Sequence, residues 1–128
     1  MTIHVRWCVE DKGILCWTFE GRWTWAHLRQ AIAQTRELGE SYTGRVDLII
    51  DVRQMGLPPA NLTSGLLEFA RMDFGFREDG INVLVGMDVY LKTLWDVLSQ
   101  RLPASWQVHY AESLDEAYDL IRKNRADV

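Results

Sequence analysis

Two short runs near the start of the chain alternate hydrophobic and polar positions. The apolar positions are Ile3, Val5, Trp7 and Val9 in the first run, and Leu15, Trp17 and Phe19 in the second. Alternation with a period of two is typical of half-buried strands. The intervening triplet at residues 11–13 (DKG) suits a three-residue hairpin loop with its glycine in the left-handed region. This loop pairs Glu10 with Ile14, and it therefore predicts that Cys8 lies opposite Cys16.

Three later segments also read as strands. The run from Val46 to Val52 is apolar in both phases, interrupted only by Asp47 and Asp51, and residues 81–85 read as another central strand. Runs that are apolar on both faces are typical of central parallel strands, because helices cover both sides of such a sheet. Residues 106–110 form a more amphipathic pattern, which predicts the last strand.

Four segments have the 3.6-residue spacing of helices. Each begins with a residue suited to capping: Thr24, Asn61, Asp88 and Ser113, the last forming a capping box with Glu116. The predicted inner faces are Leu28, Ala31, Ile32 and Thr35; Leu62, Leu66, Phe69 and Ala70; Leu91, Leu94, Trp95 and Leu98; and Leu114, Ala117, Tyr118 and Ile121. The predicted order is β-β-α-β-α-β-α-β-α.

Strands that alternate with helices indicate an α/β fold with a mostly parallel sheet. We expect a five-stranded sheet, flanked by helices, whose antiparallel N-terminal strand forms one edge. The length of 128 residues fits a single domain, residues 1–128. The edge strand is long, so a homodimer through it is an expected form of association.

Composition narrows the range of functions. A net charge of −4 argues against nucleic-acid binding, which usually needs a basic surface. We expect no membrane span and no signal peptide, because no apolar run is long enough and the start (MTIHVRWCVED) is charged. This predicts a cytoplasmic protein with two reduced cysteines. We find no metal-ligand spacing and predict no metal, no cofactor and no catalytic residue; Asp51 and Arg53 read as an ion pair.

The hairpin followed by four β-α turns resembles the SpoIIAA-like superfamily. That superfamily includes STAS domains, such as anti-sigma factor antagonists, and small bacterial relatives described as SEC14-like. STAS domains typically carry Asp-Ser-Ser/Thr-Gly-Leu at a phosphorylated helix start, and residues 62–66 here are LTSGL. The resemblance implies that Ser64 takes the phospho-acceptor place and Gly65 the glycine. The family's acidic residue falls on Leu62, which is a departure.

Ser64 and Thr63 are therefore the candidate phospho-acceptors. A phosphate in the first turn of a helix adds about two negative charges to a surface that a partner would recognise. The alternative is that these hydroxyls only cap the helix or face solvent, which is common near helix starts.

The loop after the central strand is apolar where a solvated loop would be polar. It lies beyond the carboxyl end of a parallel strand, where α/β sheets usually bind ligands. The candidate partner-binding residues here are Met55, Leu57, Pro58, Asn61 and Gly65. The alternative is that Met55 and Leu57 fold inward and close the core.

Aromatic residues crowd the junction between the second strand and the first helix. A cavity among them would hold a lipid-like ligand, as the SEC14-like side of the resemblance implies. The candidate pocket residues are Trp17, Trp23, Trp25, Phe69 and Trp95. The alternative is that these rings fill the core.

Our leading interpretation is a non-enzymatic regulatory domain that binds a protein partner, with phosphorylation near Ser64 as its switch. The resemblance implies a kinase or an anti-sigma-type regulator as that partner. The alternative is a carrier or sensor of a hydrophobic small molecule, and an enzyme ranks third.

Overall fold

The computed structural model describes residues 2–8, 13–57, 59–62, 64–65, 68, 80–89, 92–93, 96, 100 and 108–126. Its helices and strands are β1 (Thr2–Trp7), β2 (Ile14–Gly21), α1 (Trp25–Glu40), β3 (Asp47–Met55), β4 (Asn82–Val85), β5 (Val108–Ala111) and α4 (Leu114–Ala126). Residues 62, 64, 65 and 68, and residues 89, 92, 93 and 96, are also helical. These fall in the second and third predicted helices. Within the described residues, no helix is long and apolar enough to cross a membrane.

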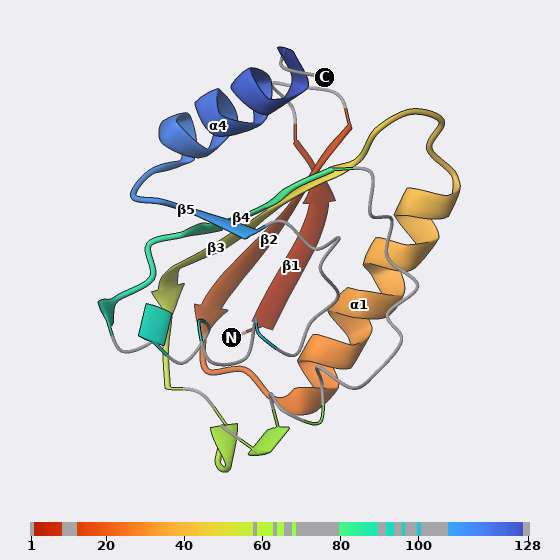
Figure 1. Cartoon of the computed structure of the whole chain (residues 1–128). Coiled ribbons are helices and arrows are strands. Elements are labelled where there is room, and N and C mark those ends of the chain that lie inside the picture. Colours follow the sequence, from red (N-terminus) through yellow and green to blue (C-terminus); the bar gives the residue numbers. More distant parts are fainter. Residues whose placement is uncertain are drawn as a thin grey trace.

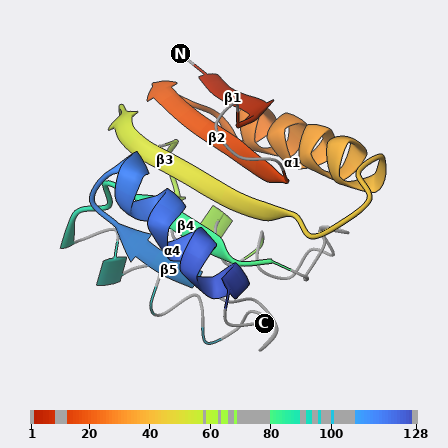
Figure 2. The same ribbon diagram turned by 90° about the horizontal axis from the view of Figure 1, so that it is seen from above.

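The sheet has five strands in the order β1-β2-β3-β4-β5. The β1–β2 pair is antiparallel, and the other three pairs are parallel. Helix α1 covers one face of the sheet and α4 the other, as Figures 1 and 2 show from two directions. The predicted fold class, with β1 as an antiparallel edge strand, is confirmed.

The register of the hairpin differs from the prediction. Val5 pairs with Trp17 and Trp7 with Leu15, where we expected Val5 opposite Phe19 and Trp7 opposite Trp17. The Cys8 N–H donates to the Ile14 carbonyl, where we expected Ile14 to pair with Glu10. The register is shifted by two residues, which keeps every side chain on its predicted face.

The shift changes the relation between the two cysteines. Cys8 is now diagonal to Cys16, and diagonal partners on paired strands have Cα atoms about 7–8 Å apart. That separation exceeds the usual disulfide range of about 4.4–6.8 Å. Both thiols are free and buried, and burial raises the pKa of Cys16 to about 11. The Cys8 thiol donates to the Tyr118 hydroxyl at 2.9 Å.

Aromatic residues dominate the core between the sheet and α1. The Trp17 indole N–H donates to Thr35 of α1 at 2.7 Å, which satisfies a buried donor. The buried members of this core are Ile3, Leu15, Trp17, Phe19, Trp23, Leu28, Ala31, Ile32, Val46 and Leu48. The whole predicted face of α1, Leu28, Ala31, Ile32 and Thr35, is buried as expected.

The core between the sheet and α4 is mostly aliphatic. Its buried members are Cys8, Ile14, Cys16, Ile49, Ile81, Val83, Val85, Ala111, Ala117, Tyr118 and Ile121. Three of these, Ala117, Tyr118 and Ile121, form the inner face predicted for the last helix.

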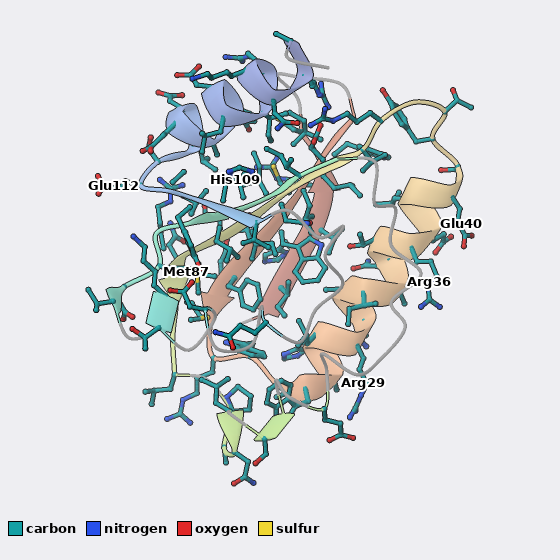
Figure 3. All side chains as sticks on the ribbon, in the orientation of Figure 1. Arg29, Arg36, Glu40, Met87, His109 and Glu112 are labelled. Atoms are coloured by element: carbon teal, nitrogen blue, oxygen red, sulfur yellow. The ribbon has the colours of Figure 1, made fainter. Side chains whose placement is uncertain are left out.

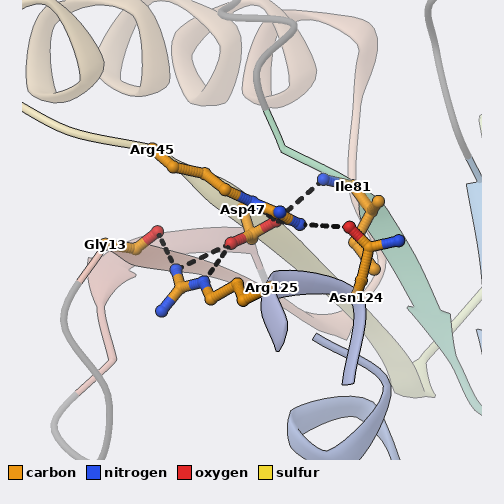
Figure 4. A network of polar contacts seen from close by, with 6 residues as sticks. All are labelled: Gly13, Arg45, Asp47, Ile81, Asn124 and Arg125. Atoms are coloured by element: carbon orange, nitrogen blue, oxygen red, sulfur yellow. Dashed lines mark hydrogen bonds and ion pairs between the residues drawn. The ribbon is translucent and has the colours of Figure 1, made fainter. Parts of the chain in front are cut away.

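A buried aspartate, Asp47, lies at the start of β3, where its hydrogen bonds join several segments of the chain (Figure 4). One oxygen of Asp47 accepts hydrogen bonds from Arg45 and from the Ile81 N–H at 2.8 to 3.0 Å. Its other oxygen accepts from Nε of Arg125 in α4 at 2.8 Å. Arg125 also donates to the Gly13 carbonyl, and Arg45 to Asn124. The network therefore joins the strand starts to the C-terminal end of α4.

Capping at the starts of α1 and α4 follows the sequence. Thr24 and His27 form a reciprocal capping box at the start of α1. The Lys92 N–H donates to the Asp88 carbonyl, and the Glu116 N–H donates to the Ser113 hydroxyl. The predicted helical positions Leu66, Phe69, Ala70, Leu91, Leu94, Trp95 and Leu98 lie outside the described residues.

Candidate functional site

Met55 and Leu57, both candidate partner-binding residues near the end of β3, have different environments in the structure. Met55 is partly buried and packs against the core under α1. Leu57, two residues later, is 64% exposed. Between them the Gly56 N–H donates to the Gly21 carbonyl at 2.8 Å, and a Cβ at Gly56 would overlap the Gly21 backbone. The loop is thus fixed against the end of β2, while Leu57 is presented to solvent.

The next described residues begin a helical turn. The Gly65 N–H donates to the Asn61 carbonyl at 2.9 Å, so Asn61 directly precedes the helical residues. Asn61 has a φ of 59°, whereas an N-cap residue normally has extended backbone. Asparagine tolerates this left-handed conformation better than most residues. Ser64 lies in the turn that follows and is exposed.

An open groove of about 520 Å³ lies between this turn and the start of α1. Its α1 wall is formed by Trp25 and Arg29, which are four positions apart and therefore share one helix face. Its other wall is formed by Ala60, Asn61, Ser64, Gly65 and Glu68. The candidate phospho-acceptor Ser64 thus lines the same groove as Trp25 and Arg29.

Gly65 sets how closely the two walls approach. A Cβ at this position would overlap the six-membered ring of the Trp25 indole. The absence of a side chain therefore lets the indole lie directly against the helical turn. Gly65 therefore shapes the groove from within the protein, and the partner contact that the sequence suggested stays a prediction.

An ion pair between Asp51 and Arg53 lies within β3. Arg53 donates from Nε and Nη2 to the two oxygens of Asp51 at 3.0 and 2.8 Å, as the sequence predicted. Burial alone would raise the pKa of Asp51. The hydrogen bonds from the side chain and backbone of Arg53 outweigh this effect and lower that pKa below its ordinary value of 3.8. A Cβ at Gly86 would overlap the Arg53 side chain, so Arg53 packs over the turn after β4.

The candidate aromatic pocket is only partly described. Trp17 and Trp23 are buried in the core, and Trp25 lies half-buried at the groove. Trp23 packs edge-on against both Phe19 and Trp25, at centroid distances of 5.3 and 5.5 Å. Phe69, Trp95, Thr63 and Pro58 lie outside the described residues.

Three groove residues were not singled out from the sequence. These are Arg29, Ala60 and Glu68. Arg29 and Ser64 are separated by 35 positions, and only the packing of the turn onto α1 brings them together. Among the described residues, His, Cys, Asp and Glu nowhere form a group of three or more suited to a metal ion.

Comparisons with known proteins identify the fold. The sequence matches no family model and no curated protein with significant similarity. The anti-sigma factor antagonist SpoIIAA, solved in its unphosphorylated form, matches with a TM-score of 0.65 and 11% identity over 94% of this chain and 98% of that one. A SpoIIAA-like protein of the DUF3478 family from Shewanella loihica matches with a TM-score of 0.63 and 14% identity over 94% and 92%. The chain therefore has the SpoIIAA-like fold over nearly its whole length, as its sequence pattern predicted.

Proposed function

We propose that this chain is a non-enzymatic regulatory domain that binds a protein partner at the groove between α1 and the turn containing Ser64. Phosphorylation of Ser64 regulates that binding. The observation that carries the proposal is the exposed Ser64 in the wall of an open groove of about 520 Å³. The hydroxyl is accessible to a kinase, and the groove offers a partner both apolar and charged surface.

The surroundings of the groove suit a protein partner. Leu57 exposes 64% of its surface on the loop that leads to the groove, and Trp25 is half-buried in the groove wall. Tryptophan and exposed aliphatic side chains are common anchors of protein interfaces. A partner that covers Leu57 and reaches Trp25 would bury both and would contact Ser64 directly.

The fold supports the same interpretation. The similar structure of SpoIIAA is that of an anti-sigma factor antagonist, captured in an unphosphorylated form. By analogy we assign this chain a cytoplasmic location and a partner of the anti-sigma regulator or kinase type. Leu62 stands where STAS domains typically carry an acidic residue, so the analogy rests on Ser64, Gly65 and the fold.

Cross-linking mass spectrometry in the native cells tests the proposal. We compare the wild-type chain with Ser64→Asp, which places a negative charge in the groove. The wild type should give partner cross-links around residues 57–68, and Ser64→Asp should reduce them at least about tenfold, a loss of about 1.4 kcal/mol in binding.

The matched control is Gln34→Asp, which adds the same charge on the exposed surface of α1 outside the groove. This variant should keep the wild-type cross-links. Equal partner binding by all three chains would overturn the regulatory role of Ser64. Cross-links concentrated around Asp47, at the start of β3, would show that the interface is not at the groove.

A carrier of a hydrophobic small molecule is the second candidate. The supporting observation is the buried indole N–H of Trp23, which has no hydrogen-bond partner among the described residues. A ligand with a carbonyl or hydroxyl group would satisfy this donor. Native mass spectrometry of the gently purified protein should then show a bound mass that Trp23→Phe abolishes. A bare chain mass for the wild type would exclude a retained ligand.

A further inference from the structure

The charges that line the groove are balanced before any modification. Arg29 projects from the α1 wall, and Glu68 belongs to the opposite wall, four positions after Ser64. These are the charged side chains among the described residues of the lining, so their formal charges sum to zero. In Figure 3, Arg29 lies near the start of α1, and Arg36 lies farther along the helix.

We propose that Arg29 binds the phosphate of phosphorylated Ser64 across the groove, so that the modification is recognised within the same chain. This inference rests on the proposed phosphorylation of Ser64 and specifies how the groove responds to it. Arg29, on one wall, would then bind the phosphate added to Ser64 on the other wall, and this contact would close the groove between them.

The chemistry of the two groups favours this pair. Phosphoserine brings about two negative charges and three strong acceptor oxygens. An arginine guanidinium presents a planar set of donors that matches a phosphate with two parallel hydrogen bonds. Glu68 lies one helical turn after Ser64 and repels the phosphate, which leaves Arg29 as its counter-charge in the groove.

Closure by this pair would also cover Trp25. Arg29 and Trp25 lie one turn apart on the same face of α1. A guanidinium held against a phosphate on the opposite wall spans the groove beside the indole. The pair would therefore block the part of the groove that we assign to the partner, and phosphorylation would lower partner binding by occlusion as well as by charge.

A phosphorus NMR titration tests the pair directly. Phosphoserine is installed at position 64 during translation, and the second pKa of its phosphate is measured in the purified protein. A neighbouring cation favours the dianion and lowers that pKa. We expect Arg29→Gln to raise the phosphate pKa by about 0.5 or more relative to the phosphorylated wild type. Glu68→Gln should lower it, because a repelling carboxylate is removed.

Arg36→Gln is the matched control. Arg36 is seven positions after Arg29 on α1, about 10 Å along the helix axis and about one Debye length away at 0.1 M salt. This variant should leave the phosphate pKa unchanged. The inference is overturned if Arg29→Gln has no effect, or if Arg36→Gln has the same effect.

The design separates this inference from the proposed function. The phosphate is installed without a cellular kinase, so the titration reports on Arg29 whether or not Ser64 is modified in cells. Conversely, the titration could give the expected pKa shift in Arg29→Gln while Ser64→Asp binds its partner as the wild type does. That result would establish the Arg29 pair and reject the regulatory role of Ser64.

Discussion

Strand β3 buries one aspartate at its first residue, Asp47, and another at its centre, Asp51, and the two are bound in different ways. Asp47 is 1% exposed and accepts hydrogen bonds from Arg45, from α4 through Arg125, and from the Ile81 N–H before β4. Asp51 is 7% exposed, and its hydrogen bonds shown in the structure come from Arg53 in the same strand.

The two surroundings differ: hydrogen bonds close the start of β3, whereas the chain beyond its end borders the groove that we propose as the interface. The Asp47 network joins four segments of the chain, at residues 13, 45–47, 81 and 124–125. Beyond Asp51, the chain presents an exposed Leu57 and an open groove with a hydroxyl, an indole and an arginine. Ligands of α/β sheets usually bind beyond the carboxyl ends of the strands, which is where we propose the interface.

The largest effect should come from Asp47→Ala. The substitution leaves two arginines without their buried counter-charge and the Ile81 N–H without its acceptor. Breaking a buried ion pair typically costs about 3–5 kcal/mol. We expect a loss of that size in the free energy of unfolding, measured by urea denaturation. A loss under about 1 kcal/mol would show that the Asp47 network contributes no more to stability than an exposed ion pair does.

Gly65→Ala should have the next largest effect. The added methyl group overlaps the Trp25 indole, and overpacking of this kind costs about 1–3 kcal/mol. The indole resonance of Trp25 in a proton–nitrogen NMR spectrum should shift as the ring moves. In a Trp25→Ala background the same substitution should cost almost nothing, because the overlapping ring is gone. An equal cost in both backgrounds would show that Trp25 is not the constraint.

The Asp51–Arg53 pair should contribute less, and its contribution should depend on pH. The Arg53 side chain is 42% exposed, so we expect only about 1 kcal/mol at neutral pH. The pKa of Asp51 is lower in the folded state, so this stability is present above the ordinary value of 3.8 and is lost as the pH falls through the folded value. The stabilities of the wild type and Asp51→Asn in urea denaturation should therefore converge as the pH falls through the folded pKa of Asp51. A constant difference would contradict a charge-based contribution.

The smallest effect on stability should come from Ser64→Ala. Ser64 is exposed, and such substitutions usually change the free energy of unfolding by less than about 0.5 kcal/mol. The same variant should remove any phosphate from this position and make partner binding independent of the kinase. A stability loss above about 1 kcal/mol, seen by urea denaturation, would indicate that the hydroxyl is a structural cap.

The fold was predictable because its determinants are local in the sequence. Alternation at residues 3–7 and 15–19 gave both hairpin strands, and Thr24 and Ser113 marked helix starts that the structure confirms. The register was wrong by two residues for a physical reason. A shift of two leaves each side chain on its face, so the hydrophobic pattern alone cannot distinguish the two pairings.

The groove and the Asp47 network were not predictable in the same way. Both depend on residues far apart in the chain, such as Arg29 with Ser64 and Asp47 with Arg125. A signal for the network did exist: an aspartate in a strand that is otherwise apolar on both faces requires buried partners. The sequence could not identify those partners, because many arginines were available.

Phosphosite mapping by mass spectrometry, on the chain purified from its own cells, tests the central claim most directly. Our account predicts a phosphate on Ser64 in a fraction of the molecules, and its loss in Ser64→Ala. A chain that carries no phosphate at Ser64 under any growth condition sampled, or that carries it on an exposed hydroxyl elsewhere such as Thr93, would contradict the account.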